Sequence, residues 1–378
     1  MRGWILLLLF AAMALPARAA QRVTVAELQQ FLTAQYAAHK SDGSIAEHLG
    51  SMELSEQLSG PTLDRITADL KPEKKAAQAL QLLADQSAFL EPPASEIPDK
   101  PAPAAAEQTR LIQGAVSFSS VTLERIPNFL ATRTTYTFDN SIFSMTPDAS
   151  RVGFVARGAL HANGEYSRQI TYREGREVNA DTAANTGKEE KPNERPYGLT
   201  STGEFGPLLQ IVLTDSAKGK VAWSYWERMR DGMAAVFKYV VPEEASHFTV
   251  DFCCVISAAP APAGSRGQRE VSSRQFHGDP GYHGFLYLDS ETGAVLRMTI
   301  EADFDGAGPT AQVGEWVEYG MVKIGEHDYQ CPVRTTAFIH LPPWRFDEDG
   351  FMNLNEVTFT NYHRFGSTAH ILSATPEP

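Results

Sequence analysis

The feature that most constrains the fold of this chain is a long series of segments with strand-like alternation. From about residue 131 to residue 365, runs rich in β-branched and aromatic residues are separated by turn signals such as Asp-Gly and Thr-Gly. In residues 248–256 every second residue is apolar, from Phe248 to Ile256. This pattern is typical of antiparallel strands with one buried face. The series therefore predicts a large antiparallel sheet.

Helical patterns precede the strands. Residues 20–91 predict four or five short helices, and Thr24 with Glu27 forms a capping box at the first of them. A similar box at Ser44 predicts the start of a second helix. Residues 92–106 are rich in Pro and Ala, which favours an extended spacer. We therefore expect a helical region at 20–91 and a linker at 92–106.

The remaining chain, residues 107–378, is expected to form one domain. A helix is predicted from Glu107 towards Pro127, and a second near 202–217, directly after a capping box at Ser201. The Asn163-Gly164 pair predicts a tight hairpin turn between two strands. The expected fold class is α+β: a large curved antiparallel sheet, or half-barrel, packed on one or two helices and preceded by a small region of short helices.

The first 19 residues have the pattern of a secretory signal peptide, with a basic Arg2, an apolar run and small residues before a cleavage site near Ala19. This pattern predicts a secreted or periplasmic protein. The apolar run is shorter than the ~20 residues that cross a bilayer, so we expect no transmembrane segment in the mature chain. The formal net charge of −13 argues against nucleic-acid partners.

The three cysteines bear on the redox compartment. Cys253 and Cys254 are adjacent, and Cys331 stands alone. Neighbouring residues on a strand point to opposite faces. In an oxidising compartment we therefore expect one disulfide, between Cys331 and either Cys253 or Cys254.

Few residues carry a recognisable chemistry. The chain contains no nucleophile elbow, zinc-protease motif or phosphate loop. His277, Asp279 and His283 lie in a Gly- and Pro-containing loop and offer metal-binding donors, although their spacing matches no known motif. The alternative is a loop with solvated histidines. We expect no catalytic residue and no cofactor.

Aromatic residues suggest either a cavity lining or an ordinary core. Trp223 and Tyr225 are predicted to share one strand face, as are Phe237 and Tyr239 on a neighbouring strand. With the apolar stripe of the helix near 202–217, they would line or fill the concave side of a curved sheet. The candidate ligand-lining residues are Phe205, Leu209, Trp223 and Phe237.

A family resemblance supports this architecture. Residues 287–297 have the pattern of a hairpin, in which Asp-Ser-Glu-Thr-Gly joins two strands. Residues 317–320, 324–325 and 331–334 carry further hairpin signatures, by which the chain as a whole resembles a group of secreted bacterial proteins. With the leading helix and the inserted helix, the region from residue 107 onward resembles the half-barrel of periplasmic lipoprotein carriers, the LolA/LolB/LppX-like fold. The resemblance implies a concave apolar sheet that shields acyl chains from water.

Three functions follow as hypotheses. The first is non-enzymatic binding of a hydrophobic ligand, such as a lipid or acyl chain, in the curved sheet. The second is a cell-envelope interaction or scaffold protein with a filled core. The third is a metal-assisted enzyme that uses His277, Asp279 and His283.

Overall fold

The structure is a computed structural model that describes residues 21–145, 152–178, 199, 201–230, 232–258, 271–304, 311–341 and 351–365. The predicted signal peptide lies outside these residues. The fold is α+β, as expected, and its main feature is a ten-stranded antiparallel sheet that is not closed into a barrel. Within the described residues, no helix is both long enough and apolar enough to cross a membrane.

The chain begins with a helical module, which we define as residues 21–100. Its elements are β1 (Gln21–Val23), α1 (Val25–Ala37), α2 (Asp42–Gly50), β2 (Met52–Leu54), α3 (Gly60–Leu70), α4 (Lys74–Gln86) and the 3-10 turn η1 (Ser87–Phe89). Thr24 and Glu27 form the predicted capping box. The second helix is capped by Ser41 instead of Ser44. The module has its own buried apolar cluster, which includes Leu28, Leu32 and Leu80.

The large sheet has the strand order β5-β4-β3-β14-β13-β12-β11-β10-β7-β6. Its strands are β3 (Phe129–Met145), β4 (Val152–Arg173), β5 (Arg176–Val178), β6 (Lys220–Met229), β7 (Gly232–Val241), β10 (Gly281–Asp289), β11 (Val295–Asp303), β12 (Gln312–Ile324), β13 (His327–Leu341) and β14 (Phe351–Arg364). The 3-10 turn η3 (Glu243–Ala245) leads to a separate two-stranded ribbon of β8 (Val250–Ala258) and β9 (Val271–Gly278).

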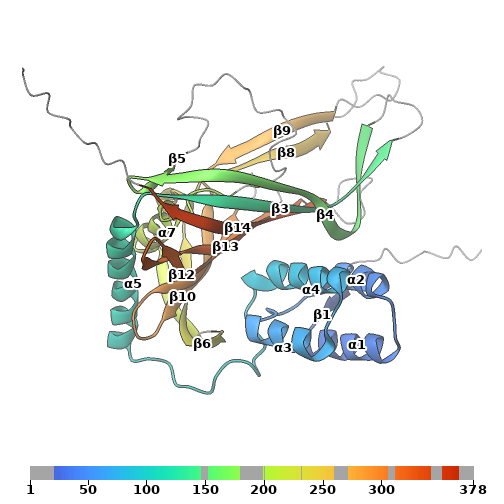
Figure 1. Ribbon diagram of the computed structural model, residues 1–378, viewed down its shortest axis with the longest axis horizontal. Coiled ribbons are helices and arrows are strands. Elements are labelled where there is room, and N and C mark those ends of the chain that lie inside the picture. Colours follow the sequence, from blue (N-terminus) through green and yellow to red (C-terminus); the bar gives the residue numbers. More distant parts are fainter. Residues whose placement is uncertain are drawn as a thin grey trace, which may run out of the picture.

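Two helices accompany the sheet. The helix α5 (Ala105–Arg125) stands at the end of the sheet opposite the N-terminal helices, and α7 (Pro207–Ser216) lies between α5 and the strands (Figure 1). The helix α7 begins at Pro207 and not directly after Ser201, because Gly206 has a non-helical backbone conformation with φ 146°. Gly293 allows α5 to approach the β10–β11 turn, since a Cβ at this position would meet the Gly114 backbone at 2.9 Å.

The hairpin prediction at Asn163-Gly164 is wrong. The strand β4 runs through these residues without a turn, and the pairing shifts so that Thr137 faces Gly164 while Phe138 faces Ala162. Asn163 is therefore the extra residue of a bulge in a long strand. The Asn-Gly pair at this bulge resembles the sequence of a tight turn. The turn follows β4, at Glu174 and Gly175, where φ is positive at both residues (53° and 80°).

The two faces of the sheet have different neighbours. We call the face that carries α7 the concave face and the opposite face the outer face. The helical module docks on the outer face, where Arg334 of β13 pairs with buried Asp85 at 2.6 Å and with Glu356 at 2.7 Å. Farther along, Arg230 pairs with Asp64 at 2.6 Å. Functional candidates on the concave face are thus separated from the module by the sheet.

Candidate functional site

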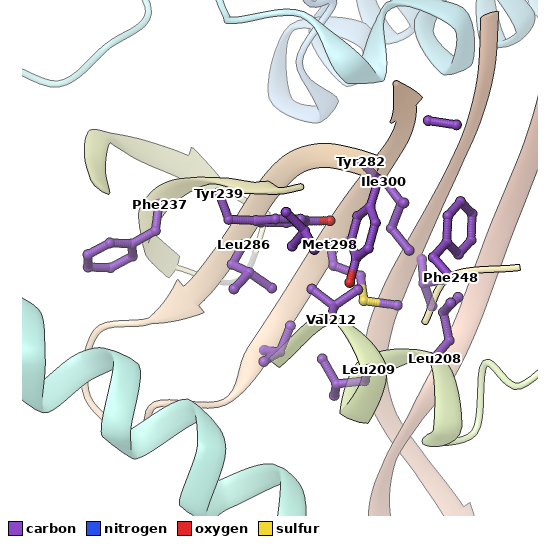
Figure 2. Close-up of a cluster of buried hydrophobic side chains, with 14 of the residues drawn as sticks. Leu208, Leu209, Val212, Phe237, Tyr239, Phe248, Tyr282, Leu286, Met298 and Ile300 are labelled. Carbon is purple, nitrogen blue, oxygen red and sulfur yellow. The ribbon is translucent and has the colours of Figure 1, made fainter. Parts of the chain in front are cut away.

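Half of the concave face is an apolar core. Leu209 and Val212 of α7 belong to the same buried cluster as Phe237 and other apolar side chains of the sheet (Figure 2). We define the apolar half by its sheet residues Phe237, Tyr239, Tyr282, Leu286, Met298 and Ile300. All six are almost fully buried. Burial of this kind is the largest favourable contribution to folding.

Phe248, which precedes the β8–β9 ribbon, also covers this region. Its ring lies 5.4 Å from the ring of Tyr282, and Phe248 belongs to the same core cluster as α7. The Tyr282 hydroxyl donates to Asp215 at the end of α7, at 3.0 Å. The ribbon base and α7 are therefore fixed to the same strand.

A small hollow remains between α5, α7 and the sheet. Its volume is about 20 Å³, enough for about one water molecule. Its wall is almost wholly apolar and includes Phe118, Ile126, Phe205, Leu209, Val295 and Tyr319. An acyl chain therefore cannot enter unless one of the covering elements moves.

The predicted lining residues are only partly brought together. Phe237, Leu209 and Trp223 meet in one cluster, with the Trp223 ring 5.5 Å from that of Phe237. Phe205 packs in a neighbouring cluster, where its ring lies 4.8 Å from that of Phe359. Of these predicted residues, Phe205 and Leu209 line the hollow.

One facing prediction is wrong. Trp223 packs on the concave face, but Tyr225 belongs to a cluster on the outer face. The pairing of β6 with β7 shifts between these residues, so Ser224 forms a bulge. A single extra residue reverses which side chains share a face. The prediction that Phe237 and Tyr239 share a face is confirmed.

The helix α5 covers the hollow from one side. Its Leu111 and Ala115 are buried and its Phe118 lines the hollow, whereas Val116 and Val121 are 47% and 46% exposed. Its N-terminus, like that of α7, has no side-chain cap. The exposed valines indicate that one stripe of α5 contributes its burial against the core.

The other half of the concave face is polar. The residue pairing across the strands makes this visible, since paired neighbours point to the same side. One row runs from Ile300 through Glu315, Ala337 and Asn355 to Thr137. We define the polar half as the buried residues Arg133, Thr135, Thr137, Asp139, Glu315, Thr335, Asn353 and Asn355.

A charged network occupies the polar half. The Arg133 guanidinium pairs with Glu204 at 3.1 Å and donates to the backbone oxygen of Ser201 at 2.7 Å. The Ser201 hydroxyl donates to the same carboxylate at 2.6 Å. Arg133 and Glu204 are 4% and 0% exposed. Their pairing offsets much of the cost of burying each charge.

A second buried carboxyl group lies nearby. Burial, and then the neighbouring Glu204, hold the pKa of Glu315 well above its usual range, although Arg133 opposes the shift. These effects favour the protonated, neutral form of Glu315. Burial and Glu204 also raise the pKa of Glu177, which lies 3.9 Å from Arg133 and 3.4 Å from Arg168.

Several polar atoms of the polar half have no partner within the described part of the chain. They are the hydroxyl oxygens of Thr137 and Thr335 and one carboxyl oxygen of Glu315. All three side chains are at least nine-tenths buried. Such atoms are costly to bury without a partner, so additional hydrogen-bonding groups near them would lower this cost.

Sequence reasoning missed this polar half. A signal exists in the alternation of Arg133, Thr135, Thr137 and Asp139, which places polar side chains at every second position. That period also describes a strand face turned to solvent. The burial of these residues depends on segments distant in sequence, so the pattern alone does not distinguish the two cases.

The three candidate metal-binding residues point to separate partners. His277 pairs with Asp251 at 3.6 Å, and Asp279 accepts from Thr249 at 2.6 Å. His283 contacts Glu301 at 3.1 Å and Asp303 at 2.8 Å through its two ring nitrogens.

Hydrogen bonding to Glu301 raises the pKa of His283, despite the opposing effect of burial. This favours the cationic ring, which cannot bind a metal. In the described residues no three His, Cys, Asp or Glu side chains form a group that could hold a metal ion.

The predicted disulfide is not formed. Cys331 is a free thiol buried in β13, and burial raises its pKa to about 12. Its expected partners, Cys253 and Cys254, belong to the separate β8–β9 ribbon, and their side chains lie outside the described part of the structure. A thiol with this pKa is unreactive near neutral pH.

No protein-family model, curated protein or solved structure matches this chain.

Proposed function

We propose that this protein binds a hydrophobic ligand, such as a lipid or acyl chain, between α5 and the concave face of the sheet. The observation that carries the proposal is the apolar hollow beneath α5, whose wall contains Phe205 and Leu209. The signal-like residues 1–19 support action in the periplasm or outside the cell.

The energies of the proposed exchange are compatible with binding. Displacing α5 exposes the buried Leu111 and Ala115, and also Ile112 and Phe118, which pack on the core or line the hollow. An acyl chain that takes the place of these side chains would bury methylene groups worth about 0.8 kcal/mol each. Burial of the ligand therefore offsets the burial that α5 loses.

The test is native mass spectrometry of the full chain, purified from a bacterial periplasm without detergent. We expect co-purified lipid, or saturable binding of a dansyl-labelled undecanoic acid when the protein is isolated empty. Leu209→Trp should reduce this binding by filling the hollow. The control is Val240→Trp, at an exposed position of β7. Absence of both lipid and saturable binding would remove the proposal.

A second candidate is a cell-envelope interaction or scaffold protein. The dense packing of α7 and Phe248 on the apolar half favours it, because a filled core needs no ligand. This function predicts no lipid by native mass spectrometry and no response to the dansyl probe. The same measurements therefore separate the two candidates.

A further inference from the structure

The polar half of the concave face calls for an explanation that acyl binding alone does not supply. A face that only held acyl chains would be lined by apolar side chains throughout. Here Thr137, Thr335 and Glu315 are buried with polar atoms that have no partner in the described residues. An atom of this kind that stays unpaired is costly. A bound group with several hydrogen-bonding atoms would recover this cost.

The charges in the polar half indicate which groups fit. Arg133 is paired with Glu204, Arg168 with Glu177, and burial favours the neutral form of Glu315. Among the described residues of the polar half, no cation is therefore left for a phosphate or sulfate. A strongly cationic group is disfavoured as well, because Glu204 and Glu177 already have arginine partners and Asp139 accepts a hydrogen bond from Asn163.

The polar atoms of Thr137, Thr335 and Glu315 that have no partner in the described residues favour a ligand with hydroxyl groups. A threonine hydroxyl both donates and accepts, and a protonated carboxyl group does the same through its two oxygens. A ligand that also donates and accepts at neighbouring atoms, with no net charge, matches this set. Polyols and sugars are the common class with this property.

The polar half is continuous with the hollow beneath α5. Tyr319 contributes to the wall of the hollow, and its hydroxyl points to the backbone oxygen of Glu204 at 3.5 Å. Both Glu204 and Glu315 raise the pKa of Tyr319, after the larger effect of burial. One residue thus borders the apolar wall and the charged network.

We propose that the polar half binds an uncharged, hydroxyl-rich head group of the same ligand whose apolar part enters the hollow beneath α5. This inference rests on the proposed function and names its ligand class as an amphiphile with a polyol or sugar head group. The head group accepts hydrogen bonds from Thr137, Thr335 and Glu315 and donates hydrogen bonds to them.

The test compares probes with one twelve-carbon chain and different head groups. Dodecyl maltoside, dodecyl phosphocholine and dodecanoate compete with the dansyl-labelled undecanoic acid, each below its critical micelle concentration. We expect dodecyl maltoside to compete at least ten-fold better than the other two. Free maltose, which has the head group without the chain, should not compete at the same concentration.

Two neighbouring threonines provide matched variants. Thr335 and Thr336 are both fully buried on β13, and neither hydroxyl has a partner among the described residues, but the two side chains point to opposite faces. Thr335→Val should abolish the preference for the maltoside, and Thr336→Val should retain it. Thr137→Val provides a second concave-face variant if Thr335→Val fails to fold.

The outcomes separate the two proposals. Equal competition by all three amphiphiles overturns the head-group inference and leaves hydrophobic binding in place. An unchanged preference in both Thr335→Val and Thr137→Val also overturns it, as does competition by maltose equal to that of the maltoside. If the dansyl probe itself does not bind, the proposed function fails, and the head-group inference fails with it.

Discussion

The apolar half and the polar half of the concave face belong to one continuous sheet, yet they are buried in different ways. In the apolar half, Phe237 and Tyr282 are covered by side chains of α7 and by Phe248. In the polar half, Arg133 is covered by the segment of Ser201 and Glu204 through hydrogen bonds and an ion pair. The first half is a closely packed apolar core, whereas the second retains polar atoms that have no partner in the part of the chain that the structure describes.

This difference separates stability from function within one surface. A well-packed apolar half can provide most of the folding free energy, since cores of this density need no further group. Buried polar groups contribute little net stability and are often present for specificity or binding. We therefore expect substitutions in the two halves to have different consequences, and the following predictions test that expectation.

The largest effect is expected in the apolar half. Phe237→Ala should lower the free energy of unfolding by about 3–5 kcal/mol, because it removes a fully buried ring and leaves a cavity. Chemical denaturation of the full chain measures this loss. Val240→Ala, on the same strand but 41% exposed, should change stability by less than about 0.5 kcal/mol. Equal losses in the two variants would contradict the assignment of this core.

Breaking the ion pair of the polar half should have the next largest effect. Arg133→Met leaves Glu204 buried without its guanidinium and should cost about 3 kcal/mol. The double variant Arg133→Met with Glu204→Gln should recover part of this loss, because the remaining charge is removed as well. Failure of the second change to restore any stability would show that the pair does not act as a unit.

The raised pKa of Glu315 predicts a pH dependence. The folded protein holds this proton more tightly than the unfolded chain, so the group's contribution is fully present below about pH 4.5. It declines as the pH rises towards the folded pKa. We therefore compare the free energy of unfolding of Glu315→Gln with that of the wild type. The difference should shift in favour of Glu315→Gln when the pH is raised from 4 to 7.5.

Denaturation at these two pH values measures the effect. Asp85 and Glu227, whose pKa values are raised to about 6 mainly by burial, titrate in both proteins and cancel in the difference. A difference between the two proteins that does not change with pH would show that Glu315 is not buried as described.

The smallest effect is expected at the unpartnered threonines. In the absence of ligand, Thr335→Val and Thr336→Val should each raise stability by up to about 1 kcal/mol, because a buried hydroxyl without a partner is removed. Thermal unfolding detects this change. Destabilisation by Thr335→Val alone would mean that its hydroxyl is already satisfied in the free protein.

The sequence predicted the fold class because alternation and turn signals are local. The positive φ at Gly293 and Gly325 and the capping box at Thr24 illustrate how reliably such signals act. The errors came from bulges: Asn163 extends a strand where a turn was expected, and the bulge at Ser224 reverses the facing of Tyr225. One extra residue in a strand leaves no clear mark in composition or period.

The candidate site was predicted only in its apolar part. Leu209 and Phe237 follow from helical and strand periodicity, and both lie in the core. The polar half could not be predicted, since its burial depends on Ser201 and Glu204 meeting Arg133, residues far apart in the chain. Long-range pairing of charges is not visible in local patterns.

Hydrogen–deuterium exchange tests the central claim most directly, namely that α5 is the movable cover of an apolar binding site. The amides of α5 (Ala105–Arg125) should exchange faster than those of α7 and β10 in the free protein, and dodecyl maltoside should change the exchange of α5 while leaving β10 unaffected. Exchange in α5 as slow as in β10, and unchanged by the amphiphile, would contradict the account.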